Sequence, residues 1–156
     1  MRYDVGVISD THGLLRPEAV AALRGVDRIV HAGDIGSAEI LDALAAIAPV
    51  TAVRGNNDHG PWAEKLALTE SLELGRVSIY VIHDLKELDL DPRAAGHSVV
   101  IAGHSHRPLS QTRDGVLFFN PGSAGPRRFT LPISVGHIVI EGSGVTGLLE
   151  TLEIST

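Results

Sequence analysis

The sequence predicts an α/β fold in which two packed mixed β-sheets are flanked by helices. The first half of the chain alternates short apolar runs with helix-like runs, which is typical of a largely parallel sheet. The second half has short apolar runs separated by turn residues, which favours further strands and hairpins. With 156 residues and 44% hydrophobic content, the chain can bury one substantial core. We therefore expect a single domain over residues 1–156.

The first half is predicted to fold as βαβαβ. Apolar runs at 5–9, 28–31 and 50–53 indicate three strands. Pro17 followed by Glu18 indicates a helix over 17–25, because proline suits the first helical turn and a carboxylate complements its dipole. Ser37 with Glu39 starts a second, amphipathic helix over 37–48.

The second half is predicted to be rich in strands. The apolar runs lie at 72–74, 77–83, 99–102, 116–119, 133–140 and 147–154. Glycine-containing turns at 75–76, 114–115 and 142–144 indicate hairpins between some of them. Neither a repeat nor a low-complexity linker divides the chain.

Charge and cysteine content narrow the classes of partner. The chain has 13 Lys plus Arg and 19 Asp plus Glu, a net charge of -6, so stable binding to nucleic acid or to an anionic membrane is disfavoured. It has no cysteine, which fits the cytoplasm and leaves no thiolate ligand or disulfide. The apolar run at 3–9 is too short for a signal peptide or a membrane span.

Polar side chains capable of binding metals follow the predicted strands where each strand ends. The carboxyl ends of parallel strands meet at one edge of a sheet, which is where α/β proteins bind ligands. Alternate residues leaving a strand point the same way, so each pair spaced by two can face one metal. Glycines at 13, 33, 55 and 103 allow tight turns beside them. The seven candidate ligands are Asp10, His12, Asp34, Asn56, His83, His104 and His106.

This mixture of imidazole and carboxylate suits a transition metal such as Mn, Fe, Zn or Ni better than a site built for Mg alone. Taken singly, the structural readings are favoured: Asp10 and Asp34 as helix caps or Asx turns, His12 as a surface histidine, and Asn56 with Asn57 as a turn pair. Caps do not explain why histidines gather at the same strand ends. The remaining histidines, His31, His97 and His137, are assigned structural roles.

Five short motifs carry a family resemblance: DTH at 10–12, GDIG at 33–36, GNND at 55–58, His83, and GHSH at 103–106. In this order they resemble the calcineurin-like metallophosphoesterases. The compact length and NPGS at 120–123 resemble the small prokaryotic phosphodiesterase branch, which shares its fold with a eukaryotic retromer subunit that acts as a scaffold. The resemblance implies a four-layer αββα sandwich.

The resemblance also implies how the ligands divide between two divalent metal ions, with Mn as first choice and Fe, Zn, Ni or Mg as alternatives. One ion would be held by Asp10, His12 and His106, and the other by Asn56, His83 and His104. Asp34 would bridge both. The family's usual nucleophile is a hydroxide between the metals, which attacks phosphorus in line.

Two positions depart from the family pattern. Asn57 replaces a histidine that protonates the leaving group, and an amide cannot transfer a proton at neutral pH. We assign Asn57 and Asp58 as catalytic residues, and Asn57, His59 and Arg127 as substrate-binding residues, with Arg128 an alternative to Arg127. Asp84 replaces a glycine after His83, where it either orients that histidine or faces solvent.

These observations predict a metal-dependent phosphoesterase that acts on a small phosphate ester, with diesters favoured because they tolerate a missing general acid. A non-catalytic protein-binding scaffold that retains the fold and metal site is the alternative. A hydrolase with a single metal is a third reading. The oligomeric state is left open, a homo-oligomer included.

Overall fold

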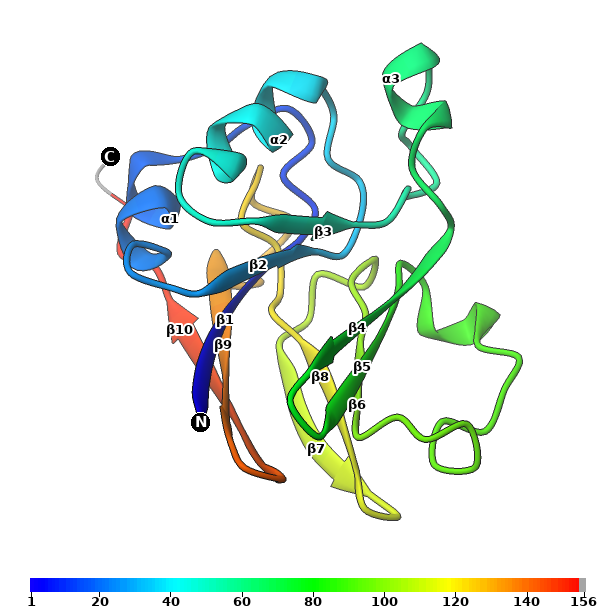
Figure 1. Ribbon diagram of the computed structural model, residues 1–156. Coiled ribbons are helices and arrows are strands. Elements are labelled where there is room, and N and C mark those ends of the chain that lie inside the picture. The colour runs from blue at the N-terminus through cyan, green and yellow to red at the C-terminus, as the bar shows by residue number, and fades with distance from the viewer. Residues whose placement is uncertain (155–156) are drawn as a thin grey trace.

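Two five-stranded sheets form the frame of the computed structural model, which describes residues 1–154 (Figure 1). In the first sheet the order is β10-β9-β1-β2-β3, with bounds β1 Arg2–Ile8, β2 Arg28–His31, β3 Val50–Ala52, β9 Ser134–Glu141 and β10 Gly144–Thr151. In the second the order is β4-β5-β6-β8-β7, with bounds β4 Thr69–Leu74, β5 Val77–Ile82, β6 Val99–Ile101, β7 Leu109–Arg113 and β8 Val116–Asn120.

The main core lies between the two sheets. Val5, Val30 and Ile138 of the first sheet belong to the same buried cluster as Ile79 and Phe119 of the second. Along β5, alternate residues face this core and the next ones face outward into a separate cluster, as the two-residue period of a strand requires. Because both faces are covered, the strand is a continuous apolar run.

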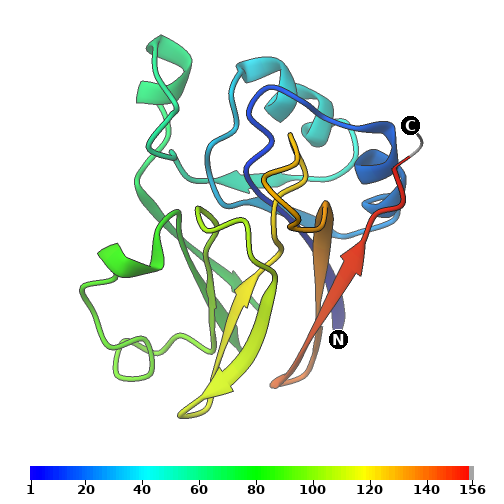
Figure 2. The ribbon, with the colours of Figure 1, turned by 180° about the vertical axis from the view of Figure 1, so that it is seen from behind.

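The outer layers differ between the two sheets. Helices α1 (Pro17–Ala22) and α2 (Ala38–Ala45) cover the first sheet through Leu23, Ile40 and Leu44. The second sheet is covered instead by the segment after β5, which contains only the 3₁₀ helix Leu85–Glu87; Figure 2 shows this segment from behind. Pro92 disfavours helix at the residue before it, so the covering layer stays irregular.

The predicted α/β fold with two mixed sheets is confirmed, with three elements added. The predicted hairpin turns at 75–76, 114–115 and 142–144 join paired strands. Strand β7, helix α3 (Pro61–Glu64) and the 3₁₀ helix were not predicted. The last strand runs over 144–151 rather than 147–154. Strand β7 is an edge strand of mostly exposed polar residues, so it lacks the apolar pattern on which the prediction depended.

Six parallel strands position the ligands. Strands β1, β2 and β3 run parallel in the first sheet, and β5, β6 and β8 run parallel in the second. Five of these strands are followed by predicted ligands, and the sixth, β8, ends at Asn120. Among the described residues, none of the helices has the length and apolarity needed to span a membrane.

Candidate metal centre

The backbone at the predicted ligands is left-handed. In residues 1–154, seven residues other than glycine have positive φ, and five of them are predicted ligands: Asp10 at 56°, His12 at 48°, Asp34 at 56°, His104 at 68° and His106 at 61°. Such conformations cost about 1–3 kcal/mol each and collect at functional sites, where the surrounding structure holds them. The strain therefore marks this strand edge as a functional site, independently of residue type.

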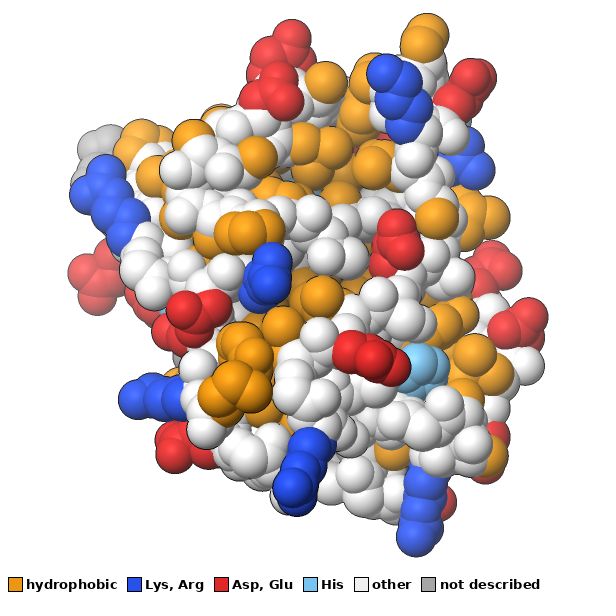
Figure 3. Space-filling view, viewed as in Figure 1, with side chains coloured by type: hydrophobic (Ala, Val, Ile, Leu, Met, Phe, Trp, Pro, Cys, Tyr) orange, Lys and Arg blue, Asp and Glu red, His pale blue; other side chains and the backbone are white. Residues whose placement is uncertain are grey.

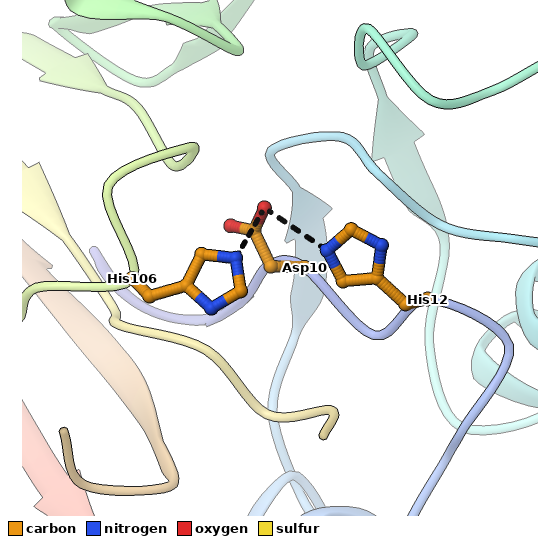
Figure 4. A group of neighbouring side chains, drawn as sticks. All are labelled: Asp10, His12 and His106. Atoms are coloured by element: carbon orange, nitrogen blue, oxygen red, sulfur yellow. Dashed lines mark ion pairs between the residues drawn. The ribbon is translucent and has the colours of Figure 1, made fainter. Parts of the chain in front are cut away.

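The first ligand group consists of Asp10, His12 and His106, whose ligand atoms lie within 4.8 Å of one another. Figure 4 shows Asp10 between the two imidazoles. Its Oδ1 lies 3.4 Å from Nε2 of His106 and 3.8 Å from Nε2 of His12. Its Oδ2 is occupied, because it accepts hydrogen bonds from the Ser9 hydroxyl at 2.6 Å and the His104 backbone N–H at 3.1 Å. Only Oδ1 is left to face the histidines.

The second ligand group consists of Asp34, His83 and His104, again within 4.8 Å, together with Asn56. Asn56 Oδ1 lies 2.9 Å from Nε2 of His83 and 3.2 Å from Nδ1 of His104. The other ring nitrogen of His83, Nδ1, lies 2.7 Å from the Ala32 carbonyl, so it carries the proton. This leaves the Nε2 lone pair directed at the group.

Asp34 connects the two groups. Its Oδ2 lies 3.3 Å from Nε2 of His83 in the second group and 3.8 Å from Nε2 of His12 in the first. One carboxylate oxygen is thus shared between histidines of both groups. Asp34 therefore lies between the two groups.

The chemistry of the donor atoms fits cations. Asp10 Oδ1, which faces Nε2 of both histidines, is buried and has no hydrogen-bond partner within residues 1–154. Burial raises the pKa of the Asp10 carboxyl, but His106 and the Ser9 hydroxyl offset this and the net pKa is lowered. A buried, ionised oxygen without a donor is costly unless a cation neutralises it.

The pKa shifts in the second group also come from its members. Burial raises the pKa of Asp34, but hydrogen bonds from His83 and Asn57 outweigh it and hold the pKa well below its usual range. Burial lowers the pKa of His83, but Asp34 and the Ala32 carbonyl outweigh it and the net pKa is raised. Asp10 and Asp34 are therefore both ionised at neutral pH. Because the pKa of His83 is raised, a proton competes with a metal ion for that histidine.

Asp58 braces two ligand loops. It is 4% exposed, and its carboxylate accepts three backbone hydrogen bonds, from Ile35 at 2.9 Å, Gly36 at 3.0 Å and Gly55 at 2.9 Å. These bonds tie the loop after β2 to the loop after β3. The geometry gives Asp58 a positioning role, and its predicted catalytic role remains a prediction.

The other predicted catalytic and substrate-binding residues are exposed, and only Asn57 contacts a ligand group. Asn57 donates to Asp34 from its backbone N–H and from its side-chain amide. His59 is exposed two residues further along. Arg127 donates to the Leu131 carbonyl at 3.3 Å, whereas Arg128 lines a cavity beside His104. Of the two arginines, the structure brings Arg128 toward the ligand groups.

Asp84 faces His104 rather than His83. Its Oδ2 lies 3.7 Å from Nε2 of His104, the nitrogen opposite the one near Asn56. Its Oδ1 accepts the Lys86 backbone N–H and caps the 3₁₀ helix. The carboxylate is therefore fixed beside the second group.

Several residues support the ligand loops. The sequence assigned His31 a structural role, whereas the supporting roles of Asn120 and Ser123 were not predicted. His31 is fully buried and connects two ligand loops. Its Nδ1 accepts the Gly33 N–H at 3.1 Å, and its Nε2 lies 3.0 Å from the Thr11 hydroxyl. The Asn120 amide donates to the Gly103 carbonyl at 3.0 Å, which holds the loop after β6. Ser123 Oγ donates to the Asp10 carbonyl at 3.1 Å. Asn120 and Ser123 belong to the NPGS segment, and the end of β8 at this edge was the available signal.

Two cavities open beside His104. The larger, of about 760 Å³, extends over β6 and β8 and includes Lys86, Arg107 and Arg128 in its wall. The smaller, of about 370 Å³, includes Asn56 and His83 in its wall. A ligand in either cavity would reach the second ligand group.

Two sheets whose parallel strands deliver carboxylates and imidazoles to one edge define an α/β metal-binding protein. The model of the calcineurin-like phosphoesterase superfamily domain matches residues 3–143, and the chain belongs to this family. A probable metallophosphoesterase of Methanothermobacter thermautotrophicus is 38% identical in an alignment of 149 residues that covers 88% of this chain and 86% of that protein.

Solved structures share the fold. Vps29 of Chaetomium thermophilum superposes with a TM-score of 0.79 at 19% identity, covering 97% of this chain and 100% of that one. A structure described as a novel archaeal phosphodiesterase has a TM-score of 0.77 at 24% identity, covering 94% and 99% of the two chains. At these identities the likeness shows the fold alone.

Proposed function

We propose that this metallophosphoesterase is a binuclear phosphodiesterase that uses two divalent cations, with Mn²⁺ as the native metal. The observation that carries the proposal is Asp34 Oδ2, which lies within 3.8 Å of a histidine from each ligand group. Two divalent cations, when bound, supply Lewis acidity that activates water and neutralises charge on phosphorus-bound oxygens. The chain's own part is to hold the ligand atoms in place.

The preference for a diester follows from what Asn57 lacks. Its amide has no proton to give a leaving group, and it is hydrogen-bonded to Asp34. The site around Asn57 therefore suits a substrate whose leaving group departs without being protonated. The lack of cysteine supports a cytoplasmic location as part of the same proposal.

The test compares two activated aryl substrates. Protein reconstituted with Mn²⁺ is assayed with bis(4-nitrophenyl) phosphate and with 4-nitrophenyl phosphate, and kcat/KM is expected to be higher for the diester. Asp34→Asn, purified in parallel, measures any contaminating phosphatase. A higher kcat/KM for the monoester would overturn the diester assignment.

A non-catalytic scaffold that retains the metal site is the second candidate, because Asn57 departs from the family pattern and Vps29 shares the fold. Metal analysis does not separate these two candidates, since both retain the ligands. Turnover does. Absence of Mn²⁺-dependent hydrolysis across diesters, monoesters and nucleotides, in protein that binds two metals, would favour the scaffold.

A further inference from the structure

The larger cavity begins at the metal centre and extends away from it. His104 of the second ligand group forms part of its wall, together with Gly103 and Ser105 of the same loop. From there the cavity covers the outer face of the second sheet, where no α-helix lies among the described residues. Its volume of about 760 Å³ is within the range of small-molecule sites. A substrate at the ligand groups would therefore have room for one arm here.

The floor of this cavity is apolar. Val100 on β6 and Phe118 on β8 both face outward and belong to the cluster on the outer face of the second sheet. Leu85 and Leu109 line the sides, and Phe118 is only partly buried. Partly exposed aromatic and aliphatic surface is the surface on which a planar ring packs.

The wall is cationic, although the chain as a whole is acidic. Lys86, Arg107 and Arg128 line the cavity and are exposed. Within residues 1–154 none of the three lies within ion-pair distance of a carboxylate, as the ion pairs of the described residues involve other side chains. The one carboxylate in the wall, Asp84, lies beside His104.

The positive charge is confined to the larger cavity. The smaller cavity on the other side of His104 is lined by Asp84, Glu87 and Asp89 with a single arginine, Arg54. On the face seen in Figure 3, charges of both signs are interspersed, without a continuous basic stripe. Unpaired guanidinium groups in a concave site select phosphate, which they bind through paired hydrogen bonds.

We infer that the larger cavity binds one arm of the substrate, and that this arm is a nucleoside carrying a second phosphate. The ring packs on Phe118 between Leu85 and Leu109, which are all partly exposed, and the second phosphate pairs with Lys86, Arg107 and Arg128. The inference rests on the proposed function for the position of the scissile phosphate at the ligand groups. It adds the class of substrate, a phosphodiester with a nucleotide arm.

The test measures equilibrium binding to the Mn²⁺-loaded protein by calorimetry, without turnover. The probes are adenosine 3′,5′-bisphosphate, AMP, ribose 5-phosphate and inorganic phosphate. We expect AMP to bind about tenfold more tightly than ribose 5-phosphate, and the bisphosphate about tenfold more tightly than AMP, as one charge-assisted contact provides. Arg128→Ala should remove the second tenfold step and leave the step between AMP and ribose 5-phosphate unchanged.

Arg76→Ala is the matched control. Arg76 is exposed in the β4–β5 turn, at the opposite end of β5 from His83, roughly 20 Å away at the rise of a strand. The Arg76→Ala substitution removes one positive charge, as Arg128→Ala does, and should alter none of the four affinities.

Equal affinities for the bisphosphate and AMP would overturn the second-phosphate contact, and equal affinities for AMP and ribose 5-phosphate would overturn the nucleoside. Loss of both steps in Arg76→Ala would show non-specific charge attraction and overturn the site. Intact binding steps without hydrolysis of any diester would contradict the proposed function and leave the cavity's selectivity standing. The two failures are therefore distinguishable.

Discussion

Asn57 donates two hydrogen bonds to Asp34, from its backbone N–H to Oδ1 at 2.9 Å and from its side-chain amide to Oδ2 at 3.1 Å. The residue that lacks a transferable proton is therefore attached to the carboxylate shared by both ligand groups. These bonds favour the ionised form of Asp34 and fix which oxygen faces the histidines. Asn57 acts on the metal centre as well as on its rim.

Asn57→Ala removes the side-chain bond and keeps the backbone bond. We expect kcat/KM for an aryl diester to fall about tenfold, with a parallel loss of metal affinity, because removing a partner of a ligating carboxylate typically costs that much. Steady-state kinetics at two Mn²⁺ concentrations separate the two effects. A lower kcat at saturating Mn²⁺ with unchanged metal affinity would instead place Asn57 on the substrate.

Asp34→Asn replaces the shared carboxylate by a neutral amide. We expect hydrolysis to fall at least about a hundredfold and bound metal to drop from two ions per chain to at most one, since the bridging charge is gone. Elemental analysis and circular dichroism check stoichiometry and folding. Asp42→Asn, which neutralises an exposed carboxylate on α2, is the control and should keep both metals. Full activity in Asp34→Asn would contradict the bridging role.

Asp58→Asn tests positioning against proton transfer. An amide nitrogen facing the Gly55 N–H sets donor against donor, so the free energy of unfolding should fall by about 2 kcal/mol and metal affinity by about tenfold. At saturating Mn²⁺ the pH–rate profile should keep its shape. Loss of one limb of that profile would assign Asp58 a catalytic proton transfer.

Gly55→Ala tests a close approach of backbone to ligand. A Cβ atom at Gly55 would collide with the backbone N and Oδ1 of Asp34, so the second ligand group should be displaced and hydrolysis should fall at least about a hundredfold. Gly142→Ala is the control. Its Cβ meets nothing within 4 Å, and its φ of 61° costs about 1 kcal/mol of stability without affecting turnover. Similar activity in both variants would contradict the packing argument.

His31 gives the metal-free protein a defined dependence on pH. Burial lowers its pKa from 6.5 to about 4, so between these values the unfolded chain binds a proton that the folded chain does not. As far as His31 is concerned, the free energy of unfolding is therefore highest above pH 6.5. It falls by roughly 3 kcal/mol as the pH drops toward 4. Urea unfolding across this window should give a flatter curve for His31→Gln. Parallel curves for the two proteins would refute the assignment.

The sequence was sufficient to predict which side chains gather at this edge, because each of them follows an apolar strand, and the order of strands and polar residues is local information. It was insufficient for the residues that brace them. Asp58 sits in the GNND motif and resembles a ligand, yet its partners lie on the loop after β2. Asn120 reaches the Gly103 carbonyl over 17 residues, and the structural role predicted for His31 did not include its contact with Thr11, 20 residues away. Strand β7 was missed because an exposed edge needs no apolar pattern.

The left-handed backbone at five ligands also bears on how such a protein changes over generations. Glycine at Asp10 or His104 would relieve about 1 kcal/mol of strain while deleting the ligand. The same substitution at Asp10 would also leave the Ser9 hydroxyl and the His104 N–H without their acceptor. Backbone strain and ligand chemistry are thus located at the same residues, so activity and folding stability are linked there. These side chains cannot be replaced without changing both.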